Sequence, residues 1–150
     1  YKKMDKNYIK EILTKDIQSL GCDIWGIEFF GKQNHQTLRI YIDNKKGISI
    51  EDCEKVSKHV VKILDVENDF SKKYLLEVSS PGLDRKFFFE DQYKDYIDCS
   101  IKVRYINDLN KKISIKGKML EVTREGLLIE SGNEDFKVPF SSIIQANLIM

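Results

Sequence analysis

Four polar residues near the middle of the chain are of the types found in hydrolytic sites: His59, Ser79, Ser80 and Asp84. A nucleophilic serine needs a base within hydrogen-bond reach and donors that stabilise an oxyanion. The sequence contains no G-x-S-x-G turn, and nothing completes a set of nucleophile, base and orienting residue. We therefore expect no catalysis, and we expect Ser79 and Ser80 to end a strand and hydrogen-bond to the turn that follows.

Metal and redox chemistry are also disfavoured. Cys22, Cys53 and Cys99 are far apart in the sequence, and they form neither a CxxC pair nor a zinc-ligand pattern with His35 or His59. We predict no metal and no cofactor. We interpret the three cysteines as reduced, half-buried residues of a cytosolic protein.

Length and charge limit the classes of protein that remain. A chain of 150 residues forms one medium domain or two small ones. The net charge is +1, with 15 Lys+Arg against 14 Asp+Glu in residues 1–85 and 10 against 10 in residues 86–150. Proteins that bind naked nucleic acid tightly usually show a basic excess or a basic stripe. The totals disfavour a strongly charge-driven RNA binder and leave a small basic patch open.

The N-terminal sequence carries no sign of secretion or membrane insertion. Tyr1–Asp5 lacks the apolar core of a signal peptide, and no run approaches the ~18 apolar residues of a membrane span. Tyr1 is not a natural start, so we expect the numbering to omit or replace a few residues. We predict a cytoplasmic protein.

The first half predicts an α/β sandwich in the order helix, strand, strand, helix, strand. Gly21 suits the stop of the first helix, and Ser49 with Asp52 predicts a short capping box for the second. The first two strands form a hairpin whose turn we expect over residues 31–36. Apolar periodicity places the helices at residues 5–20 and about 50–66, and the strands around residues 25–29, 38–42 and 74–79.

Two amphipathic helices can cover one face of a three-stranded sheet and leave the other face exposed. Strand alternation places Arg39, Tyr41, Glu77 and Ser79 on that exposed face. The element order resembles the type II KH arrangement of RNA-binding domains. None of the eight glycines forms the G-x-x-G loop that clamps nucleotides in KH domains, so any binding must use another surface.

The second half predicts a small β-barrel. A short helical turn around residues 89–93 precedes five short strands separated by tight turns. A strand containing Gly117 is long enough to need a bend at that glycine. So many short strands in some 60 residues favour a closed barrel. We thus predict two domains, residues 1–84 and 87–150.

One stretch, residues 76–85, combines a strand end, a turn and a pair of charges. Ser80-Pro81-Gly82-Leu83 predicts a type II turn, because proline presets φ at the second position and glycine accepts positive φ at the third. Asp84 and Arg85 follow with opposite charges. Two accounts of this pair remain open: it braces the junction, or Arg85 reaches a phosphate or acidic surface while Asp84 orients it.

Residues 74–85, Tyr-x-Leu-Glu-Val-Ser-Ser-Pro-Gly-Leu-Asp-Arg, resemble the signature of the bacterial ribosome maturation factor RimP family. The family usually continues with Pro-Leu, where this chain has Lys86-Phe87, so we expect a less rigid linker. Further similar segments follow the family's order: Leu38–Asp43, Gly47–Cys53, Leu64–Val66, Gly117 and Val138–Phe140.

The resemblance implies a non-catalytic factor that binds the free small (30S) ribosomal subunit and assists its assembly. It also implies contact with ribosomal RNA and small-subunit ribosomal protein twelve, no cofactor, a monomeric state and an Sm-like or SH3-like barrel in the second half. Two alternatives stay open: a stand-alone RNA-binding regulator, or a chaperone or adaptor for a basic ribosomal protein. The candidate binding residues are Arg39, Ser79, Ser80, Pro81, Gly82, Leu83, Asp84 and Arg85.

Overall fold

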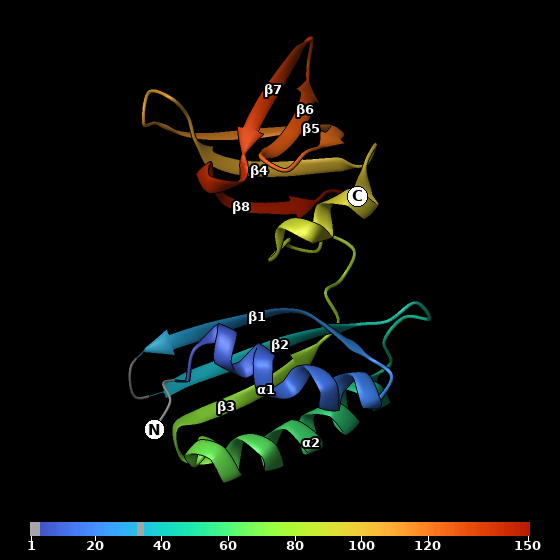
Figure 1. Cartoon of the computed structure of the whole chain (residues 1–150), viewed down its shortest axis with the longest axis vertical. Helices are drawn as coiled ribbons and strands as arrows, with labels where there is room; N and C mark the ends of the chain where they lie inside the picture. The colour runs from blue at the N-terminus through green and yellow to red at the C-terminus, as the bar shows by residue number, and fades with distance from the viewer. Residues whose placement is uncertain (1–3, 33–34) are drawn as a thin grey trace. The chain divides into compact units, whose positions relative to one another are not determined.

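The computed structural model describes residues 4–32 and 35–150, which form an α+β protein (Figure 1). The chain divides into two compact units, Tyr1–Pro81 and Gly82–Met150. Among the described residues, no helix is both long and apolar enough to span a bilayer.

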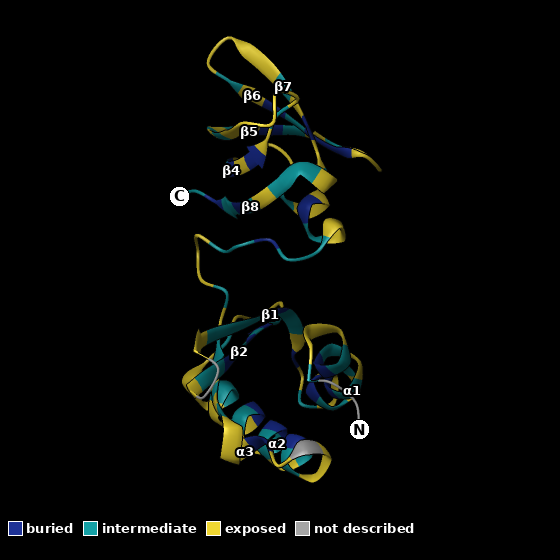
Figure 2. Cartoon of the chain, turned by 90° about the vertical axis from the view of Figure 1, so that its left-hand side faces the viewer, coloured by how far each residue is buried: buried dark blue, intermediate teal, exposed yellow. Residues whose placement is uncertain are grey.

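The first unit is a three-stranded sheet with its helices on one face (Figures 1 and 2). The strand order is β1-β2-β3, in which β2 pairs antiparallel with β1 and parallel with β3. The predicted order of helices and strands is confirmed, with one short helix added before the last strand. The elements are α1 (Lys6–Ser19), β1 (Asp23–Lys32), β2 (His35–Asp43), α2 (Ile50–Asn68), α3 (Phe70–Lys73) and β3 (Tyr74–Ser79).

The core of this unit lies between the sheet and the helices. Strand β2 contributes three fully buried side chains, and the inward faces of α1 and α2 supply the rest. The residues of this core whose exposure is 1% or less are Ile9, Leu13, Ile17, Leu38, Ile40, Ile42, Val56, Val60, Leu64 and Phe70.

Two details differ from the sequence prediction. The apolar periodicity of the predicted second helix includes Ile50, but this side chain lies in the first turn of α2 and is 80% exposed. Phe70, in a stretch expected to be a plain connection, is buried on α3 and stacks on Tyr74 with ring centroids 5.0 Å apart. A single buried aromatic in four residues shows no periodicity, so the pattern missed this helix.

The hairpin between β1 and β2 is tighter than expected. The strands pair as far as Lys32 opposite His35, whereas we expected a turn over residues 31–36. His35 therefore begins a strand rather than lying in a loop. Residues 33–34, which belong to the expected turn, lie outside the described part of the chain.

The predicted capping box of α2 is confirmed. The Ser49 hydroxyl accepts a hydrogen bond from the Asp52 amide at 3.1 Å, and the Asp52 carboxylate accepts one from the Ser49 amide at 2.9 Å. These bonds satisfy two N–H groups that the helix start would otherwise leave unpaired. They also lower the pKa of Asp52, chiefly through the Ser49 N–H, because they stabilise the charged carboxylate.

The second unit is a five-stranded antiparallel sheet of order β7-β6-β5-β4-β8. Its 3-10 helix η1 confirms the helical turn expected near residue 90. The elements are η1 (Glu90–Tyr96), β4 (Ser100–Ile106), β5 (Lys112–Val122), β6 (Gly126–Ser131), β7 (Glu134–Pro139), η2 (Phe140–Ser142) and β8 (Ile143–Leu148).

The prediction of a closed barrel is wrong for the described residues. Strands β7 and β8 lie at opposite ends of the hydrogen-bonded order and do not pair with each other. The outer edge of β8 is taken by residues 85–87 instead: the Phe87 amide donates to Ala146 O, and the Leu148 amide donates to Arg85 O, both at 2.9 Å. Lys86 forms a β-bridge with Asn147. These contacts occupy the Ala146–Leu148 part of the β8 edge, so this part does not pair with β7.

Gly117 marks a close approach of two strands. A Cβ at this position would collide with the backbone carbonyl of Glu130 on β6. The β5–β6 register then shifts between Met119 and Glu121. The strand continues past Gly117, and glycine is required there because the backbone of β6 leaves no room for a side chain.

Aromatic side chains that follow residue 86 pack within the second unit. Phe87 stacks on Tyr93 with centroids 4.2 Å apart, and Tyr96 meets Phe87 edge-on at 5.5 Å. Tyr93 also contacts Phe140, with centroids 5.5 Å apart. Burial raises the pKa of the Tyr93 phenol. Phe87 and Tyr93 are buried, so this cluster forms part of the core of the second unit.

The capping box makes stability depend on pH. Asn at position 52 resembles the protonated carboxyl, so Asp52→Asn should lower the melting temperature at pH 7. Because the folded-state pKa of Asp52 is lowered, this contribution is full above about pH 4 and disappears as the pH falls through the folded pKa. The measurement is thermal unfolding followed by fluorescence of the single tryptophan, Trp25, in β1. Glu54→Gln on the same helix is the matched control, and an equal loss there would contradict the prediction.

Candidate functional site

The predicted motif is divided between the two units. Ser79 ends β3, and its hydroxyl donates to the Ser80 carbonyl at 2.9 Å, so this serine serves the strand end as predicted. Pro81 is the last residue of the first unit, and Gly82 is the first residue of the second. Gly82 has φ +81°, as predicted, and a Cβ there would meet no atom within 4 Å. The turn itself lies at residues 83–84, later than predicted.

Residues 82–85 are held by contacts inside the second unit. The Asp84 carboxylate accepts a hydrogen bond from the Met150 amide at 3.1 Å. Arg85 donates from Nε to the Gly82 carbonyl at 3.3 Å, and its guanidinium carbon lies 5.9 Å from the centroid of the Tyr96 ring. Leu83 is 71% exposed. Both charged residues thus contact other residues of the second unit, and Leu83 is an exposed apolar residue of the motif.

Arg39 lies elsewhere, at the centre of the exposed face of the first sheet. In the strand register it stands between Glu28 on β1 and Glu77 on β3. Its Nε donates to Glu77 Oε2 at 2.7 Å, and Nη1 donates to the Tyr41 hydroxyl at 3.3 Å. Tyr41 in turn donates to Glu28 Oε1 at 2.8 Å, and the guanidinium lies 4.4 Å from the centroid of the Phe30 ring. The predicted exposed face is confirmed, and three of its four predicted residues, Arg39, Tyr41 and Glu77, are linked with Glu28 in one network.

This network, Glu28–Tyr41–Arg39–Glu77, orders Arg39 without burying it. The side chains of Arg39 and Glu77 are 33% and 51% exposed. Hydrogen bonds with Tyr41 and Glu77 raise the pKa of Arg39, while burial chiefly raises the pKa of the Tyr41 phenol. A guanidinium held over an aromatic ring by hydrogen bonds is preorganised to meet a planar anion or a partner's ring.

The structure does not bring together the residues that could form a hydrolytic site. His59 lies on α2 and faces Asp16 of α1, with Nε2 3.5 Å from Oδ1. Ser79 lies on β3 in register with Tyr41, on the other side of the sheet from the helices. Within the described residues, no cluster of His, Cys, Asp and Glu is arranged to hold a metal ion.

The cysteines differ in environment. Cys22 is buried and Cys53 is half-buried, and burial raises the pKa of both thiols, which lowers their reactivity at neutral pH. Cys99 is exposed, contrary to the expectation that all three are half-buried. None of the three is paired in a disulfide.

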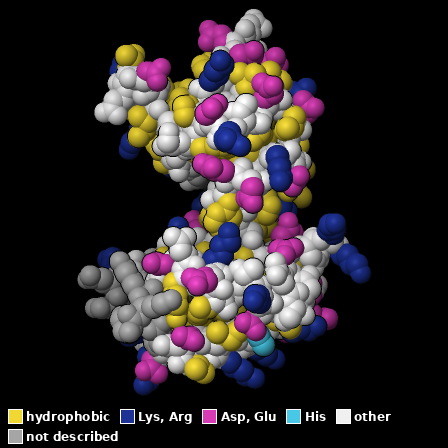
Figure 3. Space-filling view, viewed as in Figure 1, with side chains coloured by type: hydrophobic (Ala, Val, Ile, Leu, Met, Phe, Trp, Pro, Cys, Tyr) yellow, Lys and Arg dark blue, Asp and Glu magenta, His cyan; other side chains and the backbone are white. Residues whose placement is uncertain are grey.

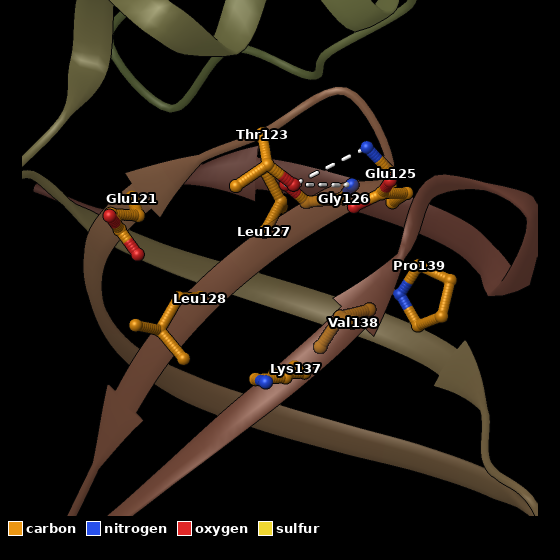
Figure 4. Close-up of a pocket in the computed structure, with 9 residues that line it drawn as sticks. All are labelled: Glu121, Thr123, Glu125, Gly126, Leu127, Leu128, Lys137, Val138 and Pro139. Atoms are coloured by element: carbon orange, nitrogen blue, oxygen red, sulfur yellow. Dashed lines mark hydrogen bonds between the residues drawn. The ribbon is translucent and has the colours of Figure 1, made fainter.

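A hollow of about 350 Å³ opens between strands β5, β6 and β7 (Figure 4). The Thr123 hydroxyl at its rim accepts hydrogen bonds from the Glu125 and Gly126 amides, both at 3.3 Å, so it belongs to the β5–β6 turn. The remaining lining is mainly aliphatic, with Glu121 and Lys137 at the edge. The hollow offers apolar surface without an activated nucleophile.

A family model described as the RimP N-terminal domain matches residues 12–84. This part of the chain belongs to the RimP family. The match begins within α1, covers α2, α3, the sheet and the Arg39 network of the first unit, and ends within the motif, at Asp84. The RimP family is a family of ribosome maturation factors, so the resemblance seen in residues 74–85 is confirmed at the level of the family.

Sequence reasoning placed Arg39, Tyr41 and Glu77 on this face but missed Glu28 and Phe30. Glu28 accepts from the Tyr41 hydroxyl and Phe30 lies under the guanidinium only because β1 and β2 pair in one particular register. Alternation along each strand identifies the exposed face, whereas the register between strands is set by long-range packing. The one local signal for this contact was the negative charge of Glu28, which is opposite to that of Arg39.

Replacing Arg39 by Gln tests whether the network serves recognition or folding. Both charges are partly solvated, so the free energy of unfolding should fall by at most ~1 kcal/mol. Loss of the Arg39 hydrogen bond should raise the pKa of Tyr41 further, because that bond now opposes the effect of burial. Trp25 fluorescence reports the first quantity, and an NMR titration of the Tyr41 ring reports the second. A loss of several kcal/mol would instead make Arg39 a structural residue.

Proposed function

We propose that this protein binds the free small (30S) ribosomal subunit and assists its assembly without catalysing a reaction. The observation that carries the proposal is the match of residues 12–84 to the RimP N-terminal domain. In this proposal the protein acts in the cytoplasm as a monomer and contacts ribosomal RNA and small-subunit ribosomal protein twelve. The finer fold comparisons, KH type II-like for the first unit and Sm-like for the second, belong to the same proposal.

The proposed binding residues are Arg39 and the motif residues Ser79, Ser80, Pro81, Gly82, Leu83, Asp84 and Arg85. Two features support them. Arg39 is half-exposed in a preorganised network, and Leu83 is an exposed aliphatic residue on a turn fixed by its neighbours. Cations and carboxylates are also interspersed on the visible surface of both units (Figure 3), which suits a composite surface of RNA and protein better than naked RNA alone.

Sedimentation tests the proposal. An assembly factor acts before the subunits join, so the tagged full chain in lysate should co-sediment with free small subunits and be depleted from assembled ribosomes. The measurement is its distribution across a sucrose gradient. Equal occupancy of translating ribosomes would contradict the assembly function. Binding to a purified basic ribosomal protein but not to subunits would favour the chaperone alternative.

Substituting Arg85 by Ala tests the motif. If Arg85 contacts the subunit, binding should weaken by ~1–3 kcal/mol, the usual cost of losing a charged contact, while the thermal melt stays native-like. Arg124→Ala, in the exposed β5–β6 turn, is the matched control. Intact binding would remove Arg85 from the site. A lost fold would assign it to bracing the second unit through Gly82 and Tyr96.

A further inference from the structure

One face of the second sheet concentrates positive charge that the chain totals conceal. Residues 100–106, 112–118 and 143–148 contain five cations and no carboxylate, although the chain as a whole has a net charge of +1. Strand alternation sends the apolar residues inward: Ile101, Val103 and Tyr105 are buried on β4. The cations of these segments therefore all lie on the outer face.

Strand register brings these cations into rows. Lys102 on β4 stands between Lys116 on β5 and Asn147 on β8. Lys86 pairs with the other side of Asn147, which extends the row across four neighbouring segments. The next row contains Gln145, Arg104 and Ser114. We call Lys86, Lys102, Arg104, Lys116, Gln145 and Asn147 the basic face.

The basic face is open and hollowed. Arg104 and Lys116 are exposed and Lys102 is half-buried. A hollow of about 310 Å³ is lined by Lys102, Arg104, Gln145 and Asn147. Among the described residues, no carboxylate forms an ion pair with Lys102, Arg104 or Lys116, and the nearest ion pair on β5 joins Lys118 to Asp98 at 3.9 Å.

We propose that the basic face binds the sugar–phosphate backbone of double-stranded RNA. Neighbouring strands are about 4.8 Å apart and alternate residues on a strand about 6.6 Å apart, so the side chains form a grid of cations and amides. Such donors are typical of contacts to phosphate and ribose. The proposal rests on the proposed function only for the identity of the RNA in the cell.

The residue types of the basic face favour RNA over other anionic partners. Protein interfaces centre on buried aromatic or aliphatic residues, and no such residue lies between these cations; Ile106, 39% exposed, lies at the end of β4. Proteins that read single-stranded RNA stack its bases on aromatic residues of a sheet. The outward positions of β4, β5 and β8 beside the basic face carry no aromatic residue. The expected recognition is therefore of backbone and shape, without base specificity.

Fluorescence anisotropy of the full chain with a labelled RNA hairpin of about 16 base pairs tests the proposal. Lys102→Glu with Lys116→Glu should raise the Kd about tenfold or more and reduce the slope of log K against log salt by about 2. Lys58→Glu with Lys62→Glu, exposed on α2, makes the same change in net charge and should leave Kd within about twofold. Equal weakening by both double variants would overturn the site, as would failure of the wild type to bind the hairpin at low salt.

The melting temperature distinguishes a variant that has lost RNA binding from one that no longer folds. Lys102 and Lys116 face each other as like charges, which is destabilising in an antiparallel pair, so Lys102→Glu alone should keep or raise the melting temperature while weakening RNA binding. If the double charge reversal fails to fold, Lys102→Gln with Lys116→Gln replaces it, with a smaller expected rise in Kd of about threefold to tenfold. Unchanged binding by that neutral variant would overturn the proposal.

Two further experiments identify the kind of partner and separate this proposal from the proposed function. Polyglutamate that displaces the hairpin as effectively as unlabelled duplex RNA would overturn the RNA assignment in favour of an acidic protein partner. Co-sedimentation with small subunits, measured separately, distinguishes the two proposals. Subunit binding without hairpin binding would remove only the basic face, whereas hairpin binding without subunit binding would leave the basic face and contradict the proposed function.

Discussion

The two-residue alternation of the central strands is the constraint on which both units depend. On β2, Leu38, Ile40 and Ile42 are fully buried, which forces Arg39 and Tyr41 onto the exposed face. On β4, Ile101 and Val103 are fully buried, which forces Lys102 and Arg104 outward. A shift by one residue on either strand would exchange core and surface. The same packing that stabilises each sheet therefore sets its candidate binding face.

The two faces differ in how their charges are arranged. Around Arg39 the neighbours across the strands are Glu28 and Glu77, so the charge is balanced locally and the guanidinium is oriented. Around Lys102 the neighbours are Lys116 and Asn147, so the charge is left for a partner to neutralise. The near-neutral net charge of the chain therefore does not reflect the local charge of either face. Separate faces of this kind suit a protein that meets more than one component of an assembling particle.

The RimP-family motif joins two structural roles at one point of the chain. Ser79 and Pro81 finish the first unit, while Asp84 and Arg85 are fixed to the second through Met150, Gly82 and the edge of β8. Residues 85 and 87 supply the two backbone hydrogen bonds that join this segment to β8, so the motif continues directly into the edge of the second sheet.

Local sequence was sufficient for the helix caps, the inward and outward positions of each strand and the family itself. Ser49 and Asp52 act within four residues, and alternation needs no knowledge of the partner strand. Four features could be known only from the tertiary structure. They are the burial of Phe70, the strand order of the second sheet with β7 and β8 at its two edges, the partners of Arg39, and the alignment of Lys86, Asn147, Lys102 and Lys116 across neighbouring segments. Each of these depends on register and on which edges meet, and both are set by contacts between residues distant in sequence rather than by local propensity.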